Sequence, residues 1–106
     1  MNNQDYIRKA VELADGWRWL HRDQVEVPLL NSAVVNPFEK QWFHDALAAQ
    51  LVRQVDATGS CVVTVHGRGT ELSPPDGTWI VRTAHGRTMN TIRAIVDSKV
   101  LETDSG

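Results

Sequence analysis

The chain has 106 residues, of which 42% are hydrophobic and 23% are charged, and its formal net charge is −2. This length fits one domain, and this composition is typical of a globular protein and excludes an intrinsically disordered chain. The 11 basic and 13 acidic residues are interspersed, which argues against a non-specific binder of nucleic acid or of anionic membranes.

Two features bear on the compartment. The single cysteine, Cys61, cannot form an internal disulfide, which fits a reducing environment. The polar start of the chain lacks the apolar core of a signal peptide, and no apolar run approaches the roughly 20 residues of a membrane span. We therefore expect a cytoplasmic protein that does not enter a membrane.

The first third of the chain predicts one helix and two extended segments. Apolar residues in 5–15 recur with the i, i+3, i+4, i+7 spacing of an amphipathic helix, and Gly16 is placed to end it. Residues 17–20 alternate and predict a short strand. Residues 25–30 alternate too, but Pro28 cannot donate to a ladder, so we predict an edge strand or a docked loop.

A long helix is predicted over 37–57. Asn36 has the character of an N-cap, Pro37 suits a first helical turn, and Glu39 can reach back to the cap. Gly59 provides the stop signal. The apolar face of this helix is broad, which predicts burial against a sheet and a flank that contacts another element or subunit.

The last part of the chain predicts strands and a closing helix. Residues 60–66 are β-branched and nearly continuous in apolar character, so we expect a central strand. Residues 70–83 predict a hairpin with a turn at 74–77, where proline, aspartate and glycine each favour a turn. A final helix is predicted over 88–98 with Thr88 as its cap.

The predicted order of elements is α-β-α-β-β-α in a single α+β domain over residues 1–106. We expect a small antiparallel sheet of three or four strands sandwiched by helices, because that arrangement buries the apolar faces of both kinds of element.

Three segments carry a resemblance to a known group of proteins. They are the opening helix at 6–17 (YIRKAVELADGW), the later helix at 42–51 (WFHDALAAQL) and the closing helix at 89–96 (MNTIRAIV). In packing pattern the chain resembles the phage ABA-sandwich domain, a helix–sheet–helix architecture. The resemblance implies a phage or prophage accessory protein in the host cytosol, and it carries no catalytic or binding residues with it.

The tripeptide His-Gly-Arg occurs twice, at 66–68 and at 85–87. Both copies follow a predicted strand, and the second lies at the start of the last predicted helix, where backbone amides favour an anion. The residues that would hold a phosphate or carboxylate are Arg68, His85, Arg87 and Thr88. The alternative is that both copies are solvated strand exits. Two neighbouring antiparallel strands would put the copies at opposite ends of the sheet, where they could not cooperate.

No stretch of the chain has the pattern of a metal site or of a catalytic site. The four histidines and Cys61 have none of the spacings of zinc ligands. Cys61 begins an apolar strand, which predicts a buried core residue and not a nucleophile. We therefore expect a protein that is not an enzyme and that needs neither a metal nor another cofactor.

Four tryptophans are many for so short a chain. Tryptophan is frequent among the residues that dominate protein interfaces, but it is equally suited to a core. We expect Trp17, Trp19 and Trp42 to be the candidates for contact with a partner, with burial in the core as the alternative.

These observations favour a non-enzymatic accessory protein that acts by binding a host or phage protein, for example to interfere with a host system. Self-association as a homo-oligomer, in the simplest case a dimer, is expected from the broad central helix. The first alternative is a protein that binds a phosphate or a nucleotide. The weaker alternative is a DNA-binding regulator that uses the last helix, although the charge pattern does not favour nucleic acid as a partner.

Overall fold

The computed structural model describes residues 2–28, 32–67, 69–75, 77 and 79–102. The predicted α+β class is confirmed, and the predicted order of helices and strands agrees in outline. The elements are α1 (Asn3–Leu13), β1 (Arg18–His21), β2 (Gln24–Val27), β3 (Ser32–Val35), the 3₁₀ turn η1 (Pro37–Glu39), α2 (Gln41–Thr58), β4 (Val62–His66), β5 (Gly69–Ser73), β6 (Ile80–Arg82) and α3 (Arg87–Ser98).

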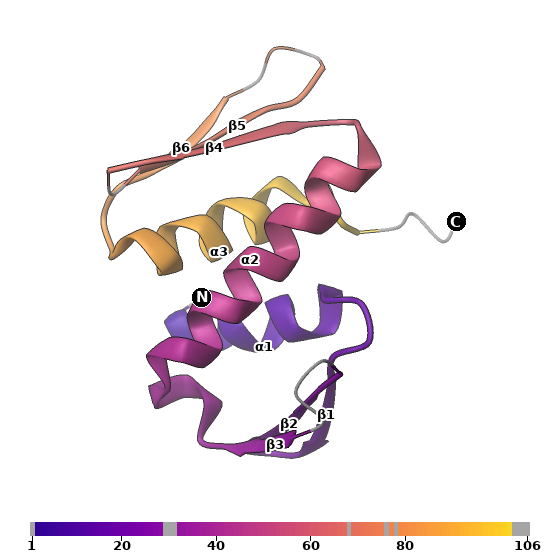
Figure 1. Cartoon of the computed structure of the whole chain (residues 1–106). Coiled ribbons are helices and arrows are strands. Elements are labelled where there is room, and N and C mark those ends of the chain that lie inside the picture. The colour runs from indigo at the N-terminus through magenta and orange to yellow at the C-terminus, as the bar shows by residue number, and fades with distance from the viewer. Residues whose placement is uncertain (1, 29–31, 68, 76, 78, 103–106) are drawn as a thin grey trace.

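The strands form two antiparallel sheets and not one. The sheets have the orders β1-β2-β3 and β4-β5-β6, and the helices lie between them (Figure 1). The expected layering, with helices outside a single sheet, is therefore reversed. The physical reason is that each set of strands pairs locally along the chain, and α2 separates the two sets. The helices then bury their apolar faces against one another and against the inner face of each sheet, in one continuous core.

Helix α1 begins two residues earlier than predicted, and its start is a capping box. The Asn2 side chain accepts from the Asp5 backbone N–H at 2.9 Å, and the Asn2 N–H donates to the Asp5 carboxylate at 3.1 Å. These bonds satisfy amides that the first helical turn leaves without partners. The helix ends earlier than predicted, at Leu13, with the extended Ala14 as its C-cap (φ −75°, ψ 125°), so Gly16 does not end it, although Gly16 is left-handed with φ +81°. Trp17 then packs against Phe43, with ring centroids 5.5 Å apart.

In the first sheet the structure corrects the prediction for residues 25–30. Strand β2 (Gln24–Val27) is the central strand and not an edge strand, and Pro28 lies just beyond its end. Strand β3 was not predicted, and it supplies the second partner of β2. The side chains of Val25, Val27 and Val34 are buried. Residues 29 and 30 lie outside the described residues.

The long predicted helix is divided in two. Lys40 is extended (φ −99°, ψ 108°) and separates η1 from α2. Asn36 is left-handed, with φ 58°, and its side chain makes no capping bond, so the predicted cap is wrong. The buried His44 ring stabilises this break, because its Nε2 is 2.7 Å from the Pro37 carbonyl oxygen. The predicted stop at Gly59 is confirmed, with φ +68°.

The second sheet corrects the place of its first strand. Strand β4 was expected to be central but lies at an edge, and its side chains alternate between exposed and half-buried. The central strand is β5, which buries Thr70 and Leu72. The predicted hairpin of β5 and β6 is confirmed as an antiparallel pair, and Gly77, at φ +82°, donates its N–H to the Pro74 carbonyl at 3.0 Å.

Helix α3 packs under β5 and β6 and also contacts α1 and α2, so it joins the two halves of the core. Polar contacts of Asp97 join α3 to α1 and to β6. Asp97 accepts a hydrogen bond from the Tyr6 hydroxyl at 2.7 Å and is ion-paired with Arg82. None of the described helices has the length and apolar character that crossing a bilayer requires.

Candidate functional site

The start of α3 holds three of the four residues predicted to bind an anion. Arg87 is the first residue of the helix and is exposed, and Thr88 and His85 lie beside it. Arg68 lies outside the described residues. The N-cap is Gly86 and not Thr88, which corrects the predicted cap. Of the predicted anion site, His85, Arg87 and Thr88 are therefore the residues that the structure describes, and they are neighbours in the chain.

The hydroxyl of Thr88 already has a negatively charged partner. It donates to Asp45 Oδ1 at 2.6 Å, and Gln41 Nε2 donates to the same oxygen at 2.9 Å. The hydrogen bond from Thr88, followed by that from Gln41, lowers the pKa of the Asp45 carboxyl below its ordinary value of 3.8. A carboxylate is thus held beside the helix start, where it repels a phosphate and opposes the predicted use of Arg87.

Asn90 shapes this helix start and was not among the predicted residues. Its side chain is buried, accepts from the His85 N–H at 3.0 Å and donates to the His85 carbonyl at 2.7 Å. Both bonds tie the loop after β6 to the first turn of α3. The only sequence signal was an asparagine on the apolar side of a predicted helix, where a buried amide needs partners.

The tryptophans fall into two groups. Trp17 and Trp19 are half-buried and pack against the core. The Trp19 ring stacks on Phe38 at 5.9 Å, and the Arg8 guanidinium lies 5.0 Å from the Trp19 ring centroid. Trp42 is 47% exposed and Trp79 is 61% exposed. Among the three tryptophans predicted for an interface, Trp42 is the most exposed and therefore the most available to a partner.

The most exposed apolar residues gather on the second sheet. Helices α2 and α3 cover one side of this sheet, and the other side faces away from the rest of the described chain (Figure 1). Alternation along β4, β5 and β6 turns every second side chain to this side. We call it the outer sheet face, and its residues are Val62, Thr64, His66, Glu71, Val81 and the adjoining Trp79.

Three large apolar side chains stand out on the outer sheet face. Val62 is 62% exposed, Trp79 is 61% exposed and Val81 is 46% exposed. Single exposed apolar residues are ordinary, but several on one flat face are typical of a contact surface. Val62 and Val81 could be predicted to lie in strands from the sequence. Their common outward face follows only from the pairing of β4 and β6 with β5.

The polar residues of the outer sheet face contact one another. Glu71 lies opposite Thr64 on one side and Val81 on the other, and its carboxylate is 3.2 Å from His66 Nε2. Among its described residues the face therefore carries no lysine or arginine, and its one carboxylate lies beside His66. Such a surface suits a protein partner better than a phosphate backbone, which requires cationic side chains.

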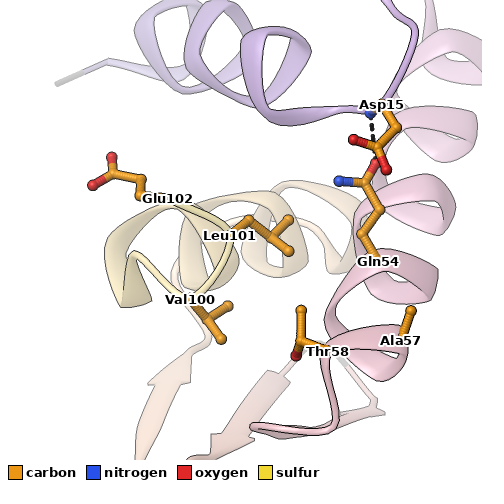
Figure 2. A pocket seen from close by; sticks show the side chains of 7 residues that line it. All are labelled: Asp15, Gln54, Ala57, Thr58, Val100, Leu101 and Glu102. Carbon is orange, nitrogen blue, oxygen red and sulfur yellow. Dashed lines mark hydrogen bonds between the residues drawn. The ribbon is translucent and has the colours of Figure 1, made fainter. Parts of the chain in front are cut away.

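A hollow between the ends of the three helices is explained by the contacts that join them. It has a volume of about 320 Å³ and lies between α2, the turn after α1 and the turn after α3 (Figure 2). Gln54 reaches from α2 across its rim, accepts from the Asp15 N–H at 2.7 Å and donates to the Leu13 carbonyl at 2.9 Å. These bonds satisfy backbone groups at the end of α1, so Gln54 acts as a joint between two helices.

Nucleophilic catalysis would depend on Cys61, and metal binding would depend on clustered histidine, cysteine, aspartate or glutamate side chains. Cys61 is buried, as expected, and burial raises the pKa of its thiol, which keeps the sulfur protonated and poorly nucleophilic. Within the described part of the chain, no group of three or more histidine, cysteine, aspartate or glutamate side chains is arranged to hold a metal ion.

Comparison with protein-family models, with curated proteins and with solved structures gave no match.

Proposed function

We propose that this protein is a small protein-binding module without catalytic chemistry of its own, and that it holds its partner on the outer sheet face. One observation carries the proposal: Val62, Trp79 and Val81 are all close to half exposed or more on a single uncovered side of one sheet. Burial of these side chains against a partner would remove apolar area from water, which is the main driving force of association.

The character of the face suggests the character of the partner. With its one carboxylate beside His66, the face would pair best with an apolar, uncharged protein surface. Trp79 is the natural centre of such a contact, because tryptophan provides a large rigid area with little conformational entropy to lose. The resemblance to phage ABA-sandwich domains suggests the setting, namely an accessory protein that acts on a host or phage protein in the host cytosol.

The test compares two exposed tryptophans. Tagged wild-type protein, Trp79→Ala and Trp42→Ala are used to capture proteins from host lysate, and any retained partner is purified and titrated against each variant. We expect Trp79→Ala to raise the Kd by at least about tenfold, as at interface hot spots, and Trp42→Ala to leave it within about twofold.

Trp42 is a matched control because it is 47% exposed but lies on α2, away from the outer sheet face. A partner whose affinity falls with Trp42→Ala and not with Trp79→Ala would move the binding surface to α2. The absence of any partner that binds the purified protein directly would overturn the proposal itself.

A further inference from the structure

Strand β4 forms an edge of its sheet that lacks the usual protection. Proteins commonly block edge strands with lysine, proline, a bulge or a very short strand, because an open edge can pair with another chain. Strand β4 reads Val-Val-Thr-Val-His, spans 5 residues and pairs with β5 in a regular register without a bulge. The opposite edge, β6, has only 3 residues and ends in Arg82.

An open groove runs below this edge. It has a volume of about 470 Å³, and its apolar lining comes from Ala48, Ala49 and Val52 of α2 and from Val65 of β4. The polar part of its wall comes from Asp45 and Arg53 of α2 and from Arg87, Thr88 and Thr91 at the start of α3. Helix α2 contacts β4, whereas α3 lies under β5 and β6. The flank of α2 is therefore in place to cover the inner side of one further strand added next to β4.

We propose that β4 pairs antiparallel with β4 of a second copy of this chain, centred on Thr64, so that the two sheets join into one sheet of six strands. In this register Thr64 lies opposite Thr64 of the second copy, and Val63 of each copy lies opposite Val65 of the other. All the β4 side chains are β-branched except His66, and β-branched cross-strand pairs stabilise such ladders.

The register also fills the groove. Val63 and Val65 are half-buried and face the helices. The same two residues of the second copy would point to the same side of the extended sheet, over Ala48, Ala49 and Val52. Each copy would in this way cover the apolar groove of the other, as expected of an isologous two-fold interface.

The charges on α2 are complementary under the same symmetry. Asp45 and Arg53 lie four residues on either side of Ala49 and both line the groove. As part of the same proposal we place the two-fold axis near Ala49, where it would bring Asp45 of each copy toward Arg53 of the other. Arg53 donates to Gln50 Oε1 at 2.8 Å, and it has no ion pair with any carboxylate among the described residues. It can therefore accept this new partner, which a second copy supplies twice.

The dimer is independent of the proposed protein-binding function. Because the two-fold axis would run perpendicular to the sheet, both outer sheet faces remain on the same side and open to partners. The dimer is also tested with the purified protein alone. Failure of either proposal can therefore be distinguished from failure of the other.

The decisive experiment adds one lysine in two matched places. Thr64 and Val81 flank Glu71 from opposite sides on the outer sheet face, so a lysine at either position can lie beside the same carboxylate in the monomer. In the dimer, Thr64→Lys places two ammonium groups opposite each other across the axis, whereas Val81→Lys does not approach it. Sedimentation equilibrium measures the mass of each variant, and circular dichroism verifies that each is folded.

We expect the wild type and Val81→Lys to have twice the monomer mass of 11.9 kDa. Thr64→Lys should raise the dimer Kd by at least about tenfold, because like charges are directly juxtaposed. A wild type that stays monomeric at the highest attainable concentration overturns the proposal. So does a folded Thr64→Lys variant with unchanged Kd, or a Val81→Lys variant that dissociates to the same extent.

A charge exchange then tests the symmetry. Arg53→Glu should weaken the dimer, because it brings two carboxylates together, and the double variant Asp45→Arg, Arg53→Glu should restore it. A folded double variant that dimerises no better than Arg53→Glu alone overturns the proposed placement of the axis.

Discussion

The two sheets of this protein have the same strand topology, but their tryptophans lie in different surroundings. Each has three antiparallel strands with its inner side on the helices. In the first sheet Trp19 faces inward, stacks on Phe38 and lies under the Arg8 guanidinium. Next to β6 in the second sheet, Trp79 is 61% exposed. Trp19 lies within β1 and Trp79 lies just before β6, so the side of the sheet that a tryptophan faces, and not its presence, decides whether it builds the core or a surface.

The edges differ in the same way. Strand β1 has a bulge between Trp19 and His21 and carries Arg18, which is paired with Glu26 at 2.9 Å. Strand β4 has neither a bulge nor a lysine or arginine side chain, and it ends in His66. An irregular, charged edge resists pairing with another chain, whereas a regular apolar edge permits it. Strand β1 is therefore poorly suited to pair with another chain, whereas β4 is open to it. The other edge of the first sheet, β3, is regular too but has only 4 residues.

The largest expected effect contrasts the two tryptophans. Trp19→Ala removes a half-buried ring with its stacking and cation–π contacts, and should lower the free energy of unfolding by about 2 kcal/mol, below the roughly 3–5 kcal/mol of a fully buried ring. Trp79→Ala should change it by less than about 0.5 kcal/mol, as is usual for surface positions. Urea denaturation followed by circular dichroism measures both. Equal losses of stability would mean that Trp79 belongs to the core.

The next effect concerns Asp97, which links the second sheet to α1. Burial opposes ionisation of this carboxyl, but the hydrogen bonds from Arg82 and Tyr6 outweigh it and lower its pKa below 3.8. Asp97→Asn should therefore cost about 1–2 kcal/mol at neutral pH, reduced from the value for a buried charge because the pair is partly exposed.

The sign of the pH dependence follows from this shift. Because the folded state has the lower pKa, the contribution of Asp97 is fully present above the unfolded value of 3.8 and is lost as the pH falls through the folded pKa. The wild type should lose stability more steeply than Asp97→Asn below pH 3.8 in a series of urea titrations. The control Asp45→Asn should keep the steep loss due to Asp97. Identical acid profiles for the wild type and Asp97→Asn would contradict the assignment.

The smallest effect concerns one side-chain pair on the outside of each sheet. Glu26→Gln breaks the contact with Arg18, and Glu71→Gln breaks the contact with His66. Both pairs are exposed, so each change should alter the free energy of unfolding by less than about 0.5 kcal/mol. Thermal unfolding at low and high salt measures this difference. A loss above about 1 kcal/mol for Glu71→Gln alone would mean that the outer sheet face also stabilises the monomer.

Much of the local structure could be predicted because its causes are local. Apolar periodicity identified all three helices, and Gly59 and Gly16 adopt the left-handed conformations expected of them. The predictions failed where a distant residue competes with a local signal. Asn36 has the type of an N-cap, but the extended Lys40 and the bond from His44 to Pro37 make that turn a separate 3₁₀ segment. Strand β3 was not predicted, because no turn residues among its four positions mark it as a strand separate from the segment before it.

The sequence predicted the kind of site, a surface for contact with a protein, but not its location. An exposed tryptophan and β-branched strands were visible in the sequence, and contact with a protein was the preferred hypothesis. The outer sheet face depends on which side of β4 and β6 the helices cover, and that choice arises from packing between segments far apart along the chain.

The α+β class, the helices and most of the strands could be inferred from the sequence alone, because they follow from apolar periodicity and turn residues within a few neighbouring positions. The presence of two sheets, the central places of β2 and β5 and the open edge at β4 emerge only in the folded molecule. Strand neighbours and buried sides are set by contacts between residues that are distant in the chain, and local patterns cannot distinguish an apolar strand in the middle of a sheet from one at its edge.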